Sequence, residues 1–66
     1  MKVLFDEKAD AIYIRFDESK IIESEEIKHG IIFDFDGKEH VVGIEILKVT
    51  ARVPLNNLKK LQFEVV

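Results

Sequence analysis

The chain has 66 residues and a net charge of −3, is 47% hydrophobic and 35% charged, and contains no cysteine. That length allows only one domain, residues 1–66, the apolar content excludes a disordered chain, and the lack of cysteine excludes disulfides and thiolate metal sites. Because so small a core is marginally stable and nothing cross-links it, we expect the chain to self-associate as a homodimer.

Short strands separated by polar turns are predicted in the first part of the chain. The run VLF at 3–5 predicts one strand, and AIYIRF at 11–16 alternates between the two faces of a second. The apolar face of that second run consists of Ile12, Ile14 and Phe16. The run IIESEEI at 21–27 is strand-like but acidic, which suits an edge strand whose charges block unwanted pairing.

A β-hairpin is predicted from IIFDFD at 31–36 and HVVGIEIL at 40–47, because both runs alternate. Asp36-Gly37 lies between them and is a strong signal for the turn. The register is constrained, since a one-residue slip would move every side chain to the other face. The expected pairs are Phe35 with His40, Phe33 with Val42, Ile31 with Ile44 and Asp34 with Val41.

The C-terminal part changes character. PLNNLKKL at 54–61 predicts a short amphipathic helix, with proline in its first turn and leucine at every third position. QFEVV at 62–66 could add a terminal strand. We therefore expect an α+β fold, in which residues 1–50 form a mainly antiparallel sheet of four to six strands and the helix packs on its apolar face. The expected core is Ile12, Ile14, Phe16, Phe33, Phe35, Val42, Ile44, Ile46, Leu55, Leu58 and Leu61.

The segment Asp34-Phe35-Asp36-Gly37 resembles two functional motifs, neither of which fits. Phosphatases of the haloacid dehalogenase superfamily place such a nucleophilic Asp on an α/β scaffold, whose βαβ units take about 30 residues each, so this chain is too short. A calcium loop starting at Asp34 would have Glu39 where glycine makes the sharp turn. The segment indicates a strand that runs into a turn at Asp36 and Gly37.

A candidate binding site remains on the sheet face opposite the apolar side chains. The residues expected there are Tyr13, Arg15, Asp34, Glu45 and either Glu23 or Glu25. Clustered carboxylates can bind a hard cation or a small ligand, so Tyr13, Asp34 and Glu45 are the candidate site residues, with the metal unspecified. The alternative is a solvated face with cross-strand ion pairs, such as Arg15 with a glutamate.

The remaining residues of interest favour structural roles. His29 and His40 have no serine, cysteine or second histidine at catalytic spacing, so we expect turn or packing roles for them, His40 beside Phe35. Gly43 indicates a bulge or a close backbone approach, or only a small residue opposite Ile32. We predict no catalytic residue and no cofactor.

Charge is unevenly distributed along the chain. Residues 1–45 hold twelve acidic and six basic side chains, whereas residues 46–66 hold one acidic and four basic ones. The acidic body disfavours nucleic-acid binding, and the basic end suits an acidic partner or a second copy. No apolar run reaches the ~20 residues of a membrane span, and acids interrupt any signal peptide. We expect a cytoplasmic protein without membrane contact; its many Glu, Lys and Ile resemble a thermophile's composition.

The ordered motifs within residues 5–47 resemble a family of short prokaryotic proteins known as domain of unknown function 2283. The matching residues are Asp10, Ala11, Ile12, Tyr13, Ile14, Glu23, Ser24, Glu26, Asp34, Asp36, Val42, Gly43, Ile44 and Glu45. The resemblance implies a small β-rich protein with a helix and no established activity. Some relatives are similar to proteins encoded next to small putative toxins, which implies an antitoxin-like binding role.

The sequence therefore predicts a non-enzymatic protein–protein interaction module that self-associates, with an antitoxin-like role toward a small partner protein as one form of it. The alternative is binding of a divalent cation or small ligand through the carboxylate-lined face.

Overall fold

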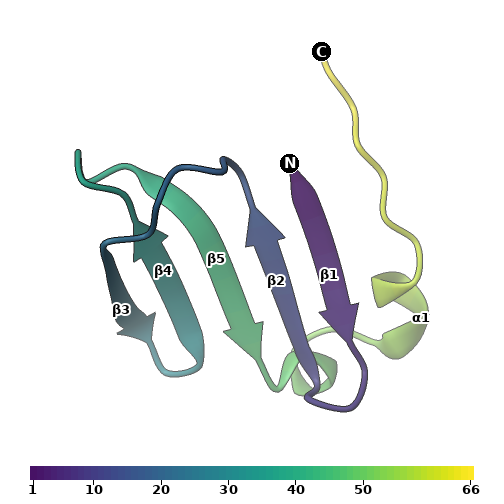
Figure 1. Cartoon of the computed structure of the whole chain (residues 1–66). Helices are drawn as coiled ribbons and strands as arrows, with labels where there is room; N and C mark the ends of the chain where they lie inside the picture. Colours follow the sequence, from purple (N-terminus) through teal and green to yellow (C-terminus); the bar gives the residue numbers. More distant parts are fainter.

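The computed structural model describes all residues, 1–66. It contains one antiparallel sheet of five strands in the order β1-β2-β5-β4-β3 (Figure 1). The strands are β1 (Lys2–Asp6), β2 (Ala11–Arg15), β3 (Glu23–Lys28), β4 (Ile31–Phe35) and β5 (Val41–Leu47). A 3₁₀ turn, η1 (Val49–Ala51), and one short helix, α1 (Leu55–Leu58), follow the sheet. The predicted α+β class with a mainly antiparallel sheet is confirmed, and no helix has the length and apolar composition to cross a membrane.

The last strand of the chain lies in the middle of the sheet. After β2 the chain runs to the far edge, forms β3 and β4 there, and returns as β5 between β2 and β4. Therefore β2 and β4 do not touch, and any contact between their side chains must pass over β5. The free edges are β1 and the acidic strand β3, all of whose residues are exposed.

The β4–β5 hairpin is confirmed, but its predicted register is wrong by two residues over most of its length. Phe33 pairs with Ile44 instead of Val42, and Asp34 with Gly43 instead of Val41. The turn is one residue longer than expected, and a bulge between Asp34 and Phe35 adds the second residue. Because the error is an even number, each strand residue before the bulge keeps its expected face.

The turn itself depends on Asp36 and on a residue other than glycine in the left-handed conformation. The Asp36 N–H donates to His40 O at 3.0 Å, and the Glu39 N–H donates to Asp36 O at 3.2 Å. Glu39 has φ 64°, whereas Gly37 does not adopt a positive φ. This is a three-residue hairpin loop with a left-handed third residue, so Asp36 and Gly37 lie in the turn as expected, but Gly37 does not occupy its left-handed position.

One side of the sheet is apolar and has no second layer over it. We call this the apolar face; it consists of Val3, Phe5, Ile12, Ile14, Ile31, Phe33, Phe35, Ile44 and Ile46, all half-buried. The buried hydrophobic residues are only Ala11, Val42 and Val49. Phe16 was expected in the core but is 44% exposed, because it follows the last residue of β2.

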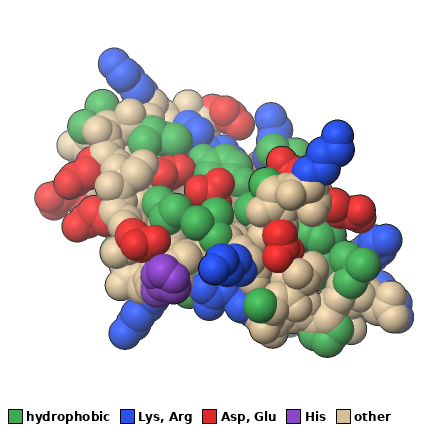
Figure 2. Space-filling model, turned by 90° about the horizontal axis from the view of Figure 1, so that it is seen from below, with side chains coloured by type: hydrophobic (Ala, Val, Ile, Leu, Met, Phe, Trp, Pro, Cys, Tyr) green, Lys and Arg blue, Asp and Glu red, His purple; other side chains and the backbone are tan.

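The C-terminal part differs from the prediction. The helix has one turn instead of spanning 54–61, and residues 62–66 form no strand. Leu55 is 43% exposed and Leu61 is 71% exposed, so the expected packing of the leucine stripe in the core is wrong. Helices this short are marginal without a packing surface, and α1 lies beyond β1 rather than across the sheet (Figure 1). Seen from below, hydrophobic side chains are exposed at this end, and acidic side chains lie at both ends of the molecule (Figure 2).

Candidate functional site

Tyr13 on β2 and Asp34 on β4 are in contact although β5 lies between their strands. The Tyr13 hydroxyl donates a hydrogen bond to Asp34 Oδ2 at 2.9 Å. The bond passes over Gly43 of β5, where an added Cβ would lie 2.7 Å from Tyr13 Oη and 3.0 Å from Asp34 Oδ2. Glycine therefore leaves the room that this contact needs. The predicted close approach at Gly43 is confirmed, and a pairing with Ile32 is excluded because Gly43 pairs with Asp34.

The contact extends across the sheet on both sides. Ser24 Oγ on β3 donates to Asp34 Oδ1 at 2.6 Å, and Arg15 Nη1 on β2 donates to Tyr13 Oη at 3.5 Å. We call Arg15, Tyr13, Asp34 and Ser24 the polar-face network. Both carboxylate oxygens of Asp34 accept hydrogen bonds within it. The network links strands β2, β4 and β3 and crosses β5, so it stabilises the order of four strands.

Burial and hydrogen bonding both change the ionisation of the Tyr13 hydroxyl. Burial of the ring raises the pKa of the Tyr13 hydroxyl above its ordinary value, and the hydrogen bond to Asp34 raises it further. Both effects disfavour the phenolate, since it would be desolvated and would lie beside a carboxylate. Tyr13 is therefore a hydrogen-bond donor at neutral pH rather than a base or a nucleophile.

The structure brings only part of the predicted site together. Tyr13 and Asp34 are in contact, whereas Glu45 lies on the same face opposite Tyr13 but outside the network. Glu23 and Glu25, one of which was expected on this face, pair with Phe35 and Phe33 and thus point to the apolar side. No three His, Cys, Asp or Glu side chains are grouped to hold a metal ion.

Ser24 is the functional residue that pattern analysis of the strands missed. The run at 21–27 has no apolar face, so alternation does not tell which of its residues point toward Asp34. The family motif could have identified it, because Ser24 belongs to the motif Glu23-Ser24-x-Glu26, one of those that carry the family resemblance. Ser24 pairs directly with Asp34 in the sheet, which places its hydroxyl on the polar face.

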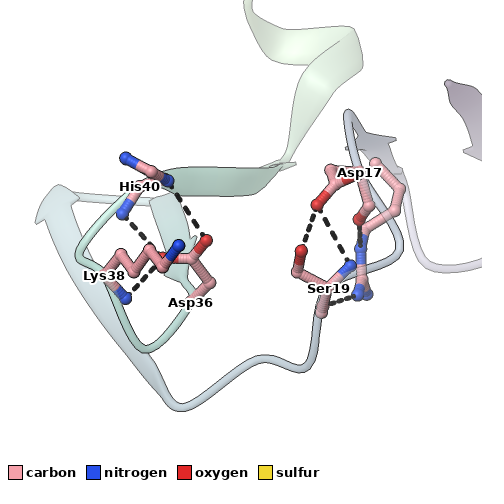
Figure 3. Close-up of polar contacts among 6 residues, drawn as sticks. Asp17, Ser19, Asp36, Lys38 and His40 are labelled. Atoms are coloured by element: carbon pink, nitrogen blue, oxygen red, sulfur yellow. Dashed lines mark hydrogen bonds and ion pairs between the residues drawn. The ribbon is translucent and has the colours of Figure 1, made fainter.

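A second group of polar residues lines an open cleft of about 430 Å³ at one end of the sheet. Figure 3 shows Asp17 and Ser19 of the β2–β3 loop on one side and Asp36, Lys38 and His40 of the β4–β5 turn on the other. Each carboxylate bonds within its own loop rather than across the cleft. Asp36 Oδ1 accepts the backbone N–H groups of Lys38 at 2.8 Å and His40 at 2.9 Å.

These local bonds also determine how the two carboxylates ionise. The His40 N–H is the main cause that lowers the pKa of Asp36, and the Ser19 hydroxyl is the main cause that lowers the pKa of Asp17. Both groups are therefore charged at neutral pH, and their hydrogen bonds hold the loops. His40 is exposed and lies 3.3 Å from Asp36 Oδ2, so its expected position beside Phe35 is wrong.

Arg15 connects the network to this cleft. Its Nε donates to Asp17 O and its Nη2 donates to Ser19 O, both at 2.5 Å. The guanidinium thus fixes the start of the β2–β3 loop, instead of forming the expected cross-strand pair with a glutamate. His29 lies in the β3–β4 turn, where its carbonyl accepts from Arg52 Nη2 at 2.8 Å.

A comparison with protein families identifies residues 2–49 as a match to the family described as protein of unknown function (DUF2283). The chain belongs to this family. No curated protein and no solved structure matches it. The DUF2283 match covers the whole sheet and all four residues of the polar-face network, and it ends at Val49. Helix α1 and the C-terminal residues lie outside the matched part.

Proposed function

We propose that this DUF2283 protein is a non-enzymatic interaction module that acts as a homodimer, with the apolar face buried between two copies. The observation that carries the proposal is the uncovered apolar face. The chain exposes 5345 Å², whereas a folded monomer of 7.7 kDa exposes about 4,300 Å² by the usual scaling with mass. The excess of about 1,000 Å² is close to the ~800 Å² that each partner buries in a standard interface.

The energetics support the same proposal. Burial of apolar surface between two copies is the main favourable contribution to association, and it must exceed a cost of about 4–15 kcal/mol in lost freedom. A single copy has three buried hydrophobic residues, Ala11, Val42 and Val49, which contribute little against the conformational entropy of ordering the chain.

The polar residues support a non-enzymatic role. Asp34 is bound by Tyr13 and Ser24, and the carboxylates of Asp17 and Asp36 are bound within their loops. In each case the acid–base group holds a neighbouring element in place.

Two adjacent residues of β1 provide a matched test. Val3 lies on the apolar face and pairs with Ile14, whereas Leu4 lies on the polar face, where it pairs with Tyr13 and is 52% exposed. Sedimentation equilibrium of Val3→Lys should show a shift from dimer to monomer, and Leu4→Lys should remain dimeric. A wild-type chain that is monomeric at high micromolar concentration, or a Val3→Lys variant that is folded by circular dichroism and still dimeric, contradicts the proposal.

A small protein of another sequence could use the same face, which is the antitoxin-like form of the module. Affinity capture of the tagged chain from its host lysate distinguishes the two forms. Recovery of the chain with itself alone supports the homodimer, whereas one stoichiometric small partner on a monomeric chain supports the antitoxin-like form.

The second candidate function is binding of a divalent cation or a small ligand on the polar face. Its support is that Tyr13, Asp34 and Glu45 share that face, with Tyr13 opposite Glu45. A cation would have to displace Tyr13 or Ser24 from Asp34. A rise in melting temperature with millimolar Mg²⁺, Mn²⁺ or Ca²⁺ that is lost in Asp34→Asn would establish this function. Absence of both calorimetric heat and a melting shift would remove it.

A further inference from the structure

We infer that the two copies stack with their twofold axis parallel to the strands, so that acidic strand β3 of each copy meets the C-terminal segment, residues 55–66, of the other. This arrangement rests on the proposed homodimer and specifies which surfaces meet in it. The occupant of the apolar face is a second copy of this chain.

The position of the apolar face within the sheet is the first argument. Its side chains come from β1, β2, β5 and β4 and not from β3. On β3 the corresponding positions are Glu23 and Glu25, which pair with Phe35 and Phe33. The centre of the apolar face therefore lies between β2 and β5, which is displaced from the middle of the five-stranded sheet toward β1. Strand β3 forms an acidic border to this face.

Two face-to-face arrangements have a twofold axis between the sheets. With the axis perpendicular to the strands, β3 lies on the partner's β3, and Glu23 and Glu25 of both copies come together, which is unfavourable. With the axis parallel to the strands and through the centre of the apolar face, β1 lies on the partner's β4, and β2 lies on the partner's β5. In this arrangement β3 extends past the partner's β1.

The C-terminal segment is what β3 meets there. Figure 1 shows α1 and the following residues on the β1 side of the sheet, opposite to β3, and an ion pair of 3.7 Å between Lys59 and Glu7 ties the segment to the β1–β2 turn. The side chains of this segment have a net positive charge that suits acidic β3, because Lys59 and Lys60 stand against one acidic residue, Glu64. Acidic side chains lie at both ends of the molecule (Figure 2), and those of β3 form the acidic strand opposite this segment.

The apolar side chains of the segment also lack a partner within the chain. Leu61, Phe63 and Val65 alternate with polar residues and are 71%, 72% and 86% exposed. On the β3 side, Ile22 is 60% exposed and Ile27 is 45% exposed. Contact between these two regions buries apolar side chains of both.

Single cysteines provide the test, since the natural chain contains none. Chains with Lys60→Cys and chains with Glu25→Cys are mixed and treated with a bis-maleimide that spans about 10 Å, the spacing of packed sheets. Each chain carries a single cysteine, so every cross-linked product joins two copies. We expect the cross-link between residues 60 and 25 to dominate. Cross-links of 60 to 60 and of 25 to 25 instead would establish the perpendicular arrangement and overturn the inference.

Charge reversal provides an independent readout. Lys60→Glu and Glu25→Lys should each raise the dimer Kd about five- to tenfold, and the two variants mixed should recover most of the affinity. Lys2→Glu on β1 is the control and should leave Kd unchanged, because Lys2 is on the polar face. If the chain is a dimer but neither reversal changes Kd, the arrangement is wrong while the proposed homodimer stands. If the wild-type chain stays monomeric and gives no cross-link, both are wrong.

Discussion

Replacing Gly43 with alanine tests the close approach between β2 and β4. An added Cβ would lie 2.7 Å from Tyr13 Oη and 3.0 Å from Asp34 Oδ2, distances at which one of the two side chains must move. The variant therefore loses the hydrogen bond between them, and a hydrogen bond to a charged group contributes about 1.5–3 kcal/mol. Alanine in a strand recovers roughly 0.5–1 kcal/mol relative to glycine. The expected net destabilisation is about 1–2 kcal/mol.

Urea denaturation at one fixed chain concentration measures this change, since the stability of a dimer depends on concentration. With a slope of about 1 kcal/mol per M for so small a domain, the midpoint should fall by about 1–2 M. The same substitution in a Tyr13→Phe background should cost less, because the hydrogen bond is already absent and the closest contact of the Cβ, to the hydroxyl, is gone. A Gly43→Ala variant as stable as the wild type, or an equal cost in both backgrounds, would refute the reasoning.

The remaining predictions concern four other positions. Tyr13→Phe should lower the free energy of unfolding by about 1–2 kcal/mol at neutral pH, because Asp34 loses a hydrogen-bond donor. In the wild type, the stabilisation from this hydrogen bond should be present below the ordinary tyrosine pKa. It should be lost as the pH rises through the raised pKa of Tyr13 in the folded chain. Folding lowers the pKa of Asp36, so the stabilisation by its carboxylate is present above the ordinary aspartate pKa and is lost as the pH falls through the pKa of the folded chain. Below about pH 4, the melting temperature should therefore fall less steeply in Asp36→Asn than in the wild type. Asp10→Ala removes two hydrogen bonds that Thr50 donates to the Asp10 carboxylate. Amide hydrogen exchange should become faster at Val49–Ala51 and stay unchanged in the sheet. Ile44→Asp puts a charge at the centre of the apolar face and should abolish folding; a cooperative melt near that of the wild type would contradict the assignment of that face.

Alternation predicted much of this fold from sequence. The assignment of side chains to the two faces of β2, β4 and β5 follows from their period of two. It stayed correct despite the register error, because a shift of two residues keeps each side chain on its face. The error arose from local features that alternation does not encode. Glu39 adopts a left-handed conformation that residues other than glycine rarely adopt, and the bulge after Asp34 adds one residue to β5.

The candidate site could be predicted only in part, since it depends on contacts between distant segments. That Tyr13 and Asp34 share a face follows from each strand alone, whereas their contact follows from the insertion of β5 between β2 and β4. Ser24 was not predicted on this face because β3 has no apolar side to orient it. The leucine spacing predicted a longer helix, but without a sheet surface beneath it only Leu55–Leu58 is helical.

The central position of β5 has a consequence for how the chain folds. Until residues 41–47 are in place, β1–β2 and β3–β4 are two separate hairpins, and isolated hairpins are marginally stable in water. Strand β5 joins the two hairpins in the step that forms its pairings with β4 and β2. A chain that ends before β5 should behave as an unfolded peptide rather than as a smaller domain, and the polar-face network forms only when this step is complete.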